Sequence, residues 1–478
     1  MDSILKTLQQ QPHIQALIPL LKRNKVYLVG GYLRNLLLNK KDGNLDLDFA
    51  VSGDALRLAK LFSRKIRGFY VVLDKKERCA RVIHNVKGQS HTLDFAQFRG
   101  ETIKKDLALR DFTINSLAVD VEKIKAAKKM EAIIIDENQG QEDLKIKLIR
   151  MTSKKSFKDD PLRIIRCFSL AAVLNFKIDK TTLTQAKKDR EKISNVAYER
   201  IRDELFKVLE VEDSTRFLRE MDKLHILEEI LPQVVIMRNV AQGPYHHLDV
   251  WQHSLEAVAQ LELLFKEMEN NADIQKYLSQ DLVVNRSRKA LMKLGELLHD
   301  IGKPQSKRRK EGRTLFHGHE RIGRKIADRI SEMLKLSTRE KFALEKMIFW
   351  HLRPGYLADN ELPTARAVFR YFRDTEDEGI SVLLISLADQ RATRGPLTSE
   401  KDRRQHERVI TDLIAHYFKK QKEKKVERLI DGNDLIKKLK LTPSPIFTKI
   451  LREIEEAQAE GSIKTKVQAL ALARKIAK

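Results

Sequence analysis

The chain has 478 residues, which is long enough for about three ordinary domains, each with its own core. Its 92 lysine and arginine residues outnumber 67 aspartate and glutamate residues, and the net charge of +25 favours a polyanionic partner. The two cysteines, Cys79 and Cys167, exclude a disulfide framework and a cysteine-rich zinc site. No apolar run approaches the roughly 18 residues of a membrane span, and the first residues lack a signal-peptide pattern, so we expect a cytoplasmic protein without membrane contact.

The predicted elements change character along the chain. In the first 150 residues short β-branched runs alternate with helical stretches, which predicts a mixed α/β domain. The predicted strands lie at 26–30, 45–51, 69–74, 80–84, 91–98 and 130–136. From about residue 160 onward apolar residues recur at spacings of three and four, so the rest is predicted to be almost wholly helical. Breaks in composition predict four domains, at 1–150, 151–237, 238–395 and 396–478.

A glycine pair, Gly30 and Gly31, follows the first predicted strand and precedes a helix. In such a position backbone N–H groups can meet a phosphate. Arg34 lies one turn further on, where its guanidinium can supply a charge-assisted partner. A glycine pair by itself is more often a tight turn, so the phosphate prediction depends on the residues further along the chain.

Asp46 and Asp48 are one residue apart on the next predicted strand, which places both carboxylates on one face. Magnesium prefers oxygen ligands, and two ions held by shared carboxylates can activate a hydroxyl nucleophile and neutralise a departing pyrophosphate. Asp94, on a later strand, joins the cluster if the two strands are adjacent. These three aspartates are the predicted catalytic residues, with Asp46 and Asp48 as the Mg²⁺ ligands.

Asp160, Arg163 and Arg166 are spaced by three, so a helix would place them on one arc of roughly 120°. A carboxylate accepts hydrogen bonds and a guanidinium only donates them, so Asp160 beside Arg163 matches an amino donor next to a ring-nitrogen acceptor. Cytosine and adenine present that edge, whereas guanine and uracil would leave buried polar groups unpaired. An exposed helix held by ion pairs is the alternative explanation of this spacing.

A second group of polar residues lies downstream, in the helical part of the chain. His253, the adjacent pair His299 and Asp300, and Asp389 combine imidazole and carboxylate ligands, a set that suits a transition metal or magnesium once a helical bundle gathers them. His319 and His351 are candidates for a second metal position, and Lys303 for contact with a substrate phosphate.

The order of these residues resembles known families. Gly-Gly-x-x-Arg followed by Asp-x-Asp is similar to the polymerase-β-like nucleotidyltransferases. The later motifs resemble the class II tRNA nucleotidyltransferase and bacterial poly(A) polymerase family, at 109–120 (LRDFTINSLAVD), 136–144, 159–179 and 197–205, and 429–473 resembles the tRNA-binding tail of the CCA-adding branch. The resemblance implies an α/β polymerase-β-like nucleotidyltransferase head on a mainly α-helical neck, HD body and tail.

The resemblance also implies roles for single residues. Its nucleotide-binding positions are Gly30, Gly31, Arg34, Arg110, Asp111, Asn115, Asp160, Arg163 and Arg166. Residues 159–179 resemble the family's nucleotide-selecting helix, here called the selecting helix, and Glu199 and Arg200 are expected to brace it. The chain departs from the family at Asn35, where aspartate is common, and at Ser169, which replaces an arginine; both bear on the position of the triphosphate, and neither is a metal ligand.

The series of His253, His299, Asp300 and Asp389 resembles the HD phosphohydrolase superfamily. This resemblance implies a divalent metal, with Ni²⁺, Mn²⁺ and Mg²⁺ as candidates, and hydrolysis of phosphoesters such as 2′,3′-cyclic phosphates. Some HD domains fused to nucleotidyltransferases serve only as a structural body, and this alternative stays open.

The partners implied are tRNA, ATP and CTP, with no protein partner. Aromatic residues make up only 6% of the chain, which favours recognition of RNA shape and backbone over base stacking. Candidate phosphate contacts are Lys307, Arg308, Arg309, Lys310, Arg403, Arg404, Lys419 and Lys420. CCA addition, A addition and poly(A) synthesis share these motifs, and residues 72–82 lie where the family has a flexible loop that separates C from A addition. A metal-dependent HD phosphohydrolase with an inactive RNA-binding head is the alternative from another class.

Overall fold

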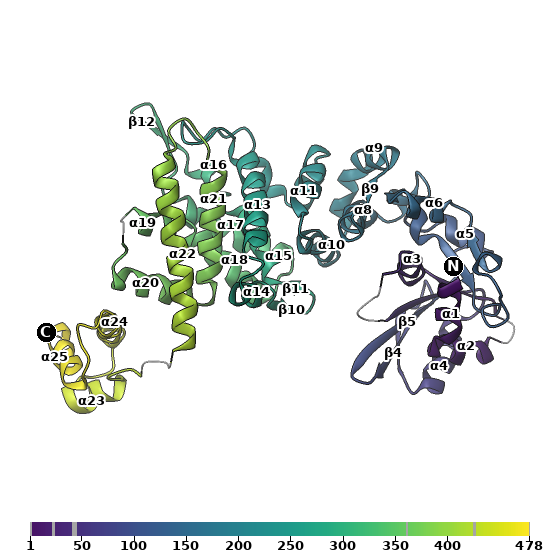
Figure 1. Cartoon of the computed structure of the whole chain (residues 1–478), viewed down its shortest axis with the longest axis horizontal. Helices are drawn as coiled ribbons and strands as arrows, with labels where there is room; N and C mark the ends of the chain where they lie inside the picture. The colour runs from purple at the N-terminus through teal and green to yellow at the C-terminus, as the bar shows by residue number, and fades with distance from the viewer. Residues whose placement is uncertain (1, 22–23, 41–44, 360–361, 424–426, 478) are drawn as a thin grey trace. The chain divides into compact units, whose positions relative to one another are not determined.

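The computed structural model describes residues 2–21, 24–40, 45–359, 362–423 and 427–477. The chain forms two compact units, the first made of residues 1–208 and 221–230, and the second of 209–220 and 231–478 (Figure 1). The chain passes between the units within helices α10 (Tyr198–Glu210) and α11 (Ser214–Lys223) and again after α12 (Ile226–Ile230).

Among the described residues, the first unit contains a seven-stranded mixed sheet with the strand order β3-β4-β5-β2-β1-β6-β7. Strands β2 and β5 are parallel, and every other neighbouring pair in this sheet is antiparallel. The strands are β1 (Val26–Val29), β2 (Asp46–Val51), β3 (Phe69–Asp74), β4 (Cys79–Val86), β5 (Gln89–Gln97), β6 (Leu117–Asp120) and β7 (Ile134–Asp136). The helices of the same region are α1 (Asp2–Gln10), α2 (Pro12–Leu17), α3 (Gly31–Leu37), α4 (Ala55–Ile66), α5 (Ile103–Ala108) and α6 (Gly140–Lys145).

Burial follows the sequence pattern in the sheet. All four residues of β1 are buried, as expected for an apolar strand with neighbours on both sides. Helix α4 begins at its N-cap Asp54, whose side chain accepts the Arg57 N–H, and its apolar side packs against β3, β4 and β5. Phe49, Phe62 and Phe95 form an aromatic contact in this core. The core therefore fixes β2 and β5, the two strands that carry the predicted catalytic aspartates.

The helices after the sheet belong to the same unit. Helix α8 is buried along most of its length, and its Leu162–Leu174 sequence ends at Asn175, which has a left-handed backbone. The elements of this part are β8 (Leu148–Ile149), α7 (Ser156–Asp159), α8 (Leu162–Leu174), β9 (Lys177–Ile178) and α9 (Lys180–Asp189). The parallel pair β8 and β9 is a small strand element that the helical periodicity did not predict.

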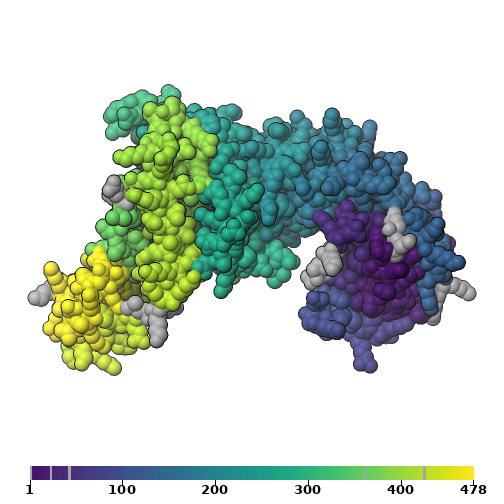
Figure 2. Space-filling model, viewed as in Figure 1, coloured from purple at the N-terminus to yellow at the C-terminus, as the bar shows by residue number. Residues whose placement is uncertain are grey.

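The second unit is a helical bundle around α21 (Gly379–Ala392), whose residues 379–388 are all buried. A helix that is apolar on every side must lie inside a protein, and α21 packs against α13, α15, α18 and α22. The other elements are α13 (Val250–Glu267), α14 (Ala272–Leu278), β10 (Asp281–Val283), β11 (Arg286–Ser287), α15 (Arg288–Leu298), α16 (Lys303–Ser306), β12 (Arg308–Lys310), β13 (Arg313–Leu315), α17 (His319–Met333), α18 (Thr338–Trp350), α19 (Arg353–Ala358), α20 (Ala365–Thr375) and α22 (Glu400–Lys422). Figure 2 shows α22 as a long strip on the surface of this unit.

The last helices have a small core of their own, formed by Ile430, Leu435, Ile450, Ile454, Ile463, Ala469 and Ala473. They are α23 (Gly432–Leu439), α24 (Ile446–Ala459) and α25 (Lys466–Ala477). Helix α24 packs against α20, where Arg366, Arg370 and Arg373 all bind the buried carboxylate of Glu456 at 2.8, 2.6 and 2.6 Å. Ion pairs therefore hold the tail against the body.

The α/β head and the mainly helical remainder confirm the predicted fold class. The predicted head and the helices that follow it share one compact unit, while the predicted domain boundaries stay predictions. Among the described residues, no helix combines the length and apolar character needed to cross a membrane.

Candidate functional site

The predicted catalytic aspartates meet on two adjacent strands. Asp46 and Asp48 lie on β2, and the parallel register pairs Asp48 with Asp94 on β5. Both oxygens of Asp94 accept hydrogen bonds from Arg81 on β4, each at 2.8 Å, which fixes the orientation of that carboxylate. Burial, followed by repulsion from Asp46 and Asp94, raises the pKa of Asp48 to about 6. The strand pairing thus gathers carboxylates whose mutual repulsion a divalent cation would relieve.

Because Gly30 has no side chain, the Asp48 carboxylate can lie directly against it. Its φ is +80°, a conformation that favours glycine, and a Cβ at this position would lie less than 3.0 Å from Asp48 Oδ2. Gly31 then begins α3. Gly30 is therefore required at this place both by its backbone conformation and by the close approach of Asp48 on β2.

A chain of hydrogen bonds connects four of the predicted nucleotide-binding residues. Arg34 is buried, and its guanidinium donates to Asn115 Oδ1 at 2.7 Å. Asn115 donates through Nδ2 to the Asp111 carboxylate at 3.2 Å, and Arg166 Nε contacts the other oxygen of Asp111 at 3.0 Å. Burial opposes the charged form, but Arg166 and the hydrogen bonds to Asp111 outweigh it and hold the pKa of Asp111 below its usual range.

Asn35 takes part in the same arrangement. Its Oδ1 accepts a hydrogen bond from Arg34 Nε at 2.9 Å, so a neutral amide orients the arginine where the resemblance implies an aspartate. Ser169, the second departure, bonds to Glu204 on α10 and to the carbonyl of Arg166. Both departures are thus accommodated by local hydrogen bonds.

The selecting helix differs from the prediction at its start. Asp160 follows α7 with an extended backbone (φ −147°, ψ 101°), and α8 begins at Leu162 after Pro161. The prediction that Asp160, Arg163 and Arg166 share one arc of a helix is therefore wrong for Asp160. The cause is Pro161, because the residue before a proline is excluded by steric clash from the helical conformation.

Arg163 and Asp160 are each held by partners in the first unit. The Arg163 guanidinium donates to Ser156 Oγ at 3.0 Å and to the Leu109 carbonyl at 3.1 Å. Asp160 accepts a hydrogen bond from Arg200 on α10 at 2.9 Å. Arg200 is predicted to brace α8, and in the structure it binds Asp160, two residues before the first residue of that helix.

Arg110 and residues 72–82, which the sequence also singled out, belong to the first unit. Arg110 donates to Asp106 at 3.0 and 3.2 Å, and its positive charge partly offsets the raised pKa of Asp48, which places that charge near β2. Residues 72–82 form the end of β3, a turn and the start of β4, and the apolar side chains of Val71, Val72 and Leu73 are exposed there.

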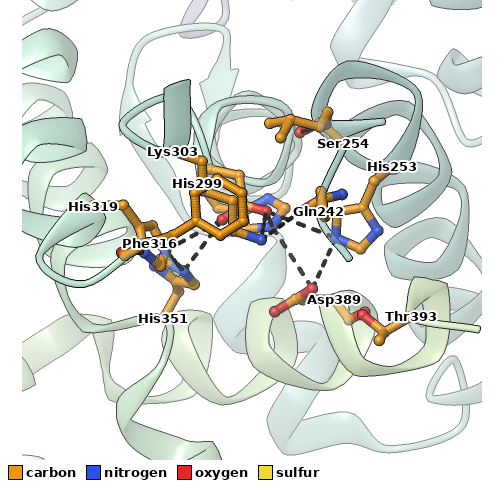
Figure 3. Close-up of polar contacts among 12 residues, drawn as sticks. Gln242, His253, Ser254, His299, Lys303, Phe316, His319, His351, Asp389 and Thr393 are labelled. Atoms are coloured by element: carbon orange, nitrogen blue, oxygen red, sulfur yellow. Dashed lines mark hydrogen bonds and ion pairs between the residues drawn. The ribbon is translucent and has the colours of Figure 1, made fainter. Parts of the chain in front are cut away.

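The second candidate site lies inside the helical bundle of the other unit (Figure 3). Among the described residues of this bundle, two groups of three side chains could each hold a metal ion: His253, His299 and Asp389, and Asp300, His319 and His351. These residues come from α13, α17 and α21 and from the ends of α15 and α18. Figure 3 shows His319 and His351 on one side of His299, and His253 with Asp389 on the other.

Asp300 faces both groups. Its Oδ2 lies 3.2 Å from His299 Nε2 and 3.9 Å from His253 Nε2. Its Oδ1 lies 3.3 Å from His319 Nε2 and 3.8 Å from His351 Nε2. Asp300 would therefore be able to offer an oxygen ligand to a divalent cation held by the histidines on either side.

Three of the imidazoles are oriented by the backbone. Nδ1 of His299, His319 and His351 lies 2.7, 2.8 and 2.7 Å from the carbonyl three residues earlier in each case. A proton on Nδ1 then leaves the Nε2 lone pair directed at the centre, as in metal-ligating histidines. His299 Nε2 is buried and makes no hydrogen bond with suitable geometry, so the donor set fits a divalent metal.

Two histidines of this centre have pKa values shifted in opposite directions. Burial lowers the pKa of His351 to about 3. Burial also acts on His299, but the Asp300 and Asp389 carboxylates outweigh it and raise the pKa of His299 to about 10. Lys303, predicted to contact a phosphate, lies 2.6 Å from Asp300 Oδ2 and donates to Gln242 at 2.7 Å.

One contact of the first site, between Asp111 and Arg166, has no signal in the sequence. The ion pair of Asp111 with Arg166 joins residues 55 positions apart in the sequence, and no local pattern indicates it. Of the predicted basic residues, Lys307 follows α16, Arg308, Arg309 and Lys310 form the exposed strand β12, and the other four lie on α22.

Family models match successive parts of the chain. The Poly A polymerase head domain matches residues 26–150, and the model described as "Probable RNA and SrmB- binding site of polymerase A" matches 175–237. The HD domain matches 250–394, and tRNA nucleotidyltransferase domain 2 matches 375–473.

Full-length relatives agree with these matches. The chain is 29% identical to an A-adding tRNA nucleotidyltransferase of Deinococcus radiodurans over 94% of each chain. It is 27% identical to a CC-adding tRNA nucleotidyltransferase of Synechocystis over 98% of this chain and 97% of the relative. The solved Thermotoga maritima CCA-adding enzyme in complex with tRNA has a similar fold, with a TM-score of 0.64 and 22% identity over 99% of this chain and 98% of that one.

The carboxylate-bearing sheet and the helices that follow it define a nucleotidyltransferase joined to an HD domain. The chain belongs to the tRNA nucleotidyltransferase and poly(A) polymerase family.

Proposed function

We propose that the chain is a template-independent RNA nucleotidyltransferase that adds C, A or both, from CTP and ATP, to the 3′ end of tRNA. The observation that carries the proposal is the register of β2 and β5, which gathers Asp46, Asp48 and Asp94. The relatives named A-adding and CC-adding tRNA nucleotidyltransferases support this substrate. The proposed function implies the cytoplasm, a reducing compartment in which Cys79 and Cys167 stay free thiols.

Asp46 and Asp48 are the proposed ligands of Mg²⁺. The bound ions would lower the pKa of the primer 3′-hydroxyl and neutralise charge on the departing pyrophosphate. Asp94, held by Arg81, completes the carboxylate cluster. Arg34, Arg110 and the glycine pair are proposed to bind the triphosphate and align its α-phosphorus with the attacking hydroxyl.

Asp160 and Arg163 are proposed to select the base. The carboxylate of Asp160 accepts from the amino group of cytosine or adenine, and the Arg163 guanidinium donates to the ring nitrogen beside it. Asp160 stands on the short connection between α7 and α8, and Arg200 holds it at 2.9 Å. Arg166, Asp111 and Asn115 are proposed to hold the sugar and phosphates.

The proposal is tested with tRNAs that end at the discriminator base or at CC. Each is offered labelled ATP, CTP, GTP or UTP singly. An A-adding enzyme incorporates A on the CC-ended tRNA alone, a CC-adding enzyme incorporates C on the shorter substrate, a CCA-adding enzyme does both, and a poly(A) polymerase adds many A residues.

A pair of variants tests the catalytic centre. The double substitution Asp46→Ala, Asp48→Ala should abolish addition, while Asp203→Ala, at an exposed aspartate of α10, should leave it unchanged. Addition that survives in the double variant would contradict the assignment.

We infer a second activity, hydrolysis of phosphoesters at the HD site. The supporting observation is Asp300, whose two oxygens face the two groups of metal-binding residues. A divalent metal held there would supply Lewis acidity and an activated water. Lys303, beside Asp300, is proposed to neutralise the substrate phosphate.

Metal analysis and hydrolysis separate this activity from nucleotide addition. The wild-type chain should retain two equivalents of Mn²⁺ or Ni²⁺ after dialysis, and Asp300→Asn should retain fewer and lose hydrolysis while keeping addition. If the head is an inactive RNA-binding module, the wild-type chain will hydrolyse phosphoesters but add no nucleotide.

A further inference from the structure

The catalytic face of the head sheet continues beyond the aspartates to the edge strand β3. The strand register pairs Asp48 with Asp94, Asp94 with Arg81, and Arg81 with Val71. Residues that are directly paired on neighbouring strands project from the same face of a sheet. Val71 therefore lies on the face of the catalytic carboxylates, at three strand spacings, or about 14 Å, from Asp48.

A second row of paired residues runs beside the first and ends at Phe69. Asp46 is paired with Thr92, Thr92 with Ile83, and Ile83 with Phe69. The edge of the catalytic face is therefore apolar. Phe69, Val71 and Ile83 together form this edge platform.

The edge platform is open to solvent, whereas the opposite face of the same strands is packed. Phe69 is 69% exposed and Val71 is 44% exposed. Ala80 and Val82 of β4 point to the other face, where they are fully buried against α4. Edge strands of soluble proteins usually carry charged side chains or are covered, so exposed apolar side chains at this edge indicate a binding surface.

Basic side chains flank the edge platform at both ends of β3. Those before the strand are Arg64, Lys65 and Arg67, those after it are Lys75, Lys76 and Arg78, and all six are exposed. Asp74 and Glu77 are the acidic residues of the same stretch. Positive charge around exposed apolar and aromatic faces is typical of surfaces that bind single-stranded nucleic acid, because phosphates meet the cations while bases stack on the rings.

The same charges disfavour a second copy of the chain as the occupant. Antiparallel pairing of two β3 edges would bring the basic residues before one strand against the basic residues after the other. Like charges that face each other across paired strands are destabilising. The occupant that this surface favours is therefore a polyanion with flat bases.

The distance to the aspartates determines which part of an RNA can reach the edge platform. In the proposed reaction the 3′-hydroxyl of the primer lies at Asp46 and Asp48. Stacked nucleotides advance about 3.4 Å each, so the separation of about 14 Å corresponds to about four nucleotides. The bases that contact Phe69 and Val71 therefore belong to the last few nucleotides before the 3′ end.

We propose that the edge platform binds the 3′-terminal bases of the RNA primer and so positions the 3′-hydroxyl at the carboxylate cluster. The inference rests on the proposed nucleotide addition and names the surface that holds the primer during it. Stacking on Phe69 tolerates any sequence, because every base has an aromatic face. Such tolerance suits a primer whose terminal base changes after each addition.

Steady-state addition by the full-length chain tests the edge platform. Phe69→Ala should raise KM for the tRNA that the chain extends by about tenfold and leave KM for the nucleotide within about twofold. Phe69→Trp should keep KM for tRNA near the wild-type value, because tryptophan also offers a stacking face. Phe342→Ala is the matched control, because Phe342 lies on α18 of the second unit and is 57% exposed. Thermal unfolding confirms that each variant is folded.

Photocrosslinking locates the contact on both molecules. A photoreactive thiouridine replaces one nucleotide at a time along the 3′ end of the tRNA, and the crosslinked peptides are mapped by mass spectrometry. Crosslinks to residues 69–83 should be strongest for the last few nucleotides before the 3′ end and weak for the acceptor helix. Phe69→Ala should lower their yield severalfold, and Phe342→Ala should not.

The outcomes distinguish this proposal from the proposed function. If the wild-type chain extends no tRNA, the proposed function fails, and crosslinking alone decides the edge platform. If Phe69→Ala leaves both KM for tRNA and the crosslinks unchanged, or if the crosslinks lie outside residues 69–83, the proposal is overturned. A wild-type dimer that Phe69→Ala converts to monomer, with KM for tRNA unchanged, would assign the platform to self-association instead.

Discussion

Gly30→Ala is expected to damage catalysis through the metal-binding strand. The substitution has two separate costs, because Gly30 has φ +80° and because a Cβ would lie less than 3.0 Å from Asp48 Oδ2. The backbone cost for a residue with a side chain is about 1–3 kcal/mol. The second cost falls on Asp48, which must withdraw by several tenths of an ångström from the position proposed for Mg²⁺.

Gly88→Ala is the matched control for the backbone cost. Gly88 has φ +83° in the turn between β4 and β5, and a Cβ there meets no atom within 4 Å. Both substitutions should therefore lower the thermal stability of the chain by a similar amount. Only Gly30→Ala should displace a catalytic carboxylate.

The assay measures kcat/KM for addition of labelled nucleotide to tRNA, together with thermal unfolding of each variant. A misplacement that approaches 1 Å costs about 100-fold in rate, so Gly30→Ala should fall by about 10- to 100-fold below Gly88→Ala. Equal activity of the two variants at equal stability would show that the contact with Asp48 does not position the catalytic centre.

Three other substitutions each probe one local set of contacts. Asp111→Asn removes the negative charge that holds Arg166 at 3.0 Å, so KM for the nucleotide should rise about tenfold, measured by steady-state addition, with a smaller change in kcat. Burial, followed by the charges of His91 and His84, lowers the pKa of His13 to about 4. The stability that depends on neutral His13 is therefore full above about pH 6.5 and is lost as the pH falls toward 4. In His13→Gln the melting temperature should depend less on pH across this window. Glu456→Ala should detach the tail from the body, because three arginines bind that carboxylate. Amide exchange in α24 should then accelerate about tenfold or more, while α13 and α21 keep their secondary structure.

Local sequence determined the elements and several of the residues. Alternation along a strand places Asp46 and Asp48 on one face whatever the rest of the chain does, because side chains repeat every second residue. Helical periodicity predicted the bundle, and the order of the motifs indicated the family before any contact was known. The order of His253, His299, Asp300 and Asp389 in the sequence likewise predicted a metal site, and the structure brings these side chains close together.

Tertiary structure decided which of these residues meet. Asp94 joins Asp48 because β2 and β5 pair although two other strands lie between them in the sequence. Asp160 lies outside the helix because Pro161 follows it, and Arg166 pairs with Asp111, which comes from a distant part of the sequence. Propensity and periodicity act within one element. Strand order and the position of Asp300 between two groups of side chains depend on packing between distant segments, which only the folded chain fixes.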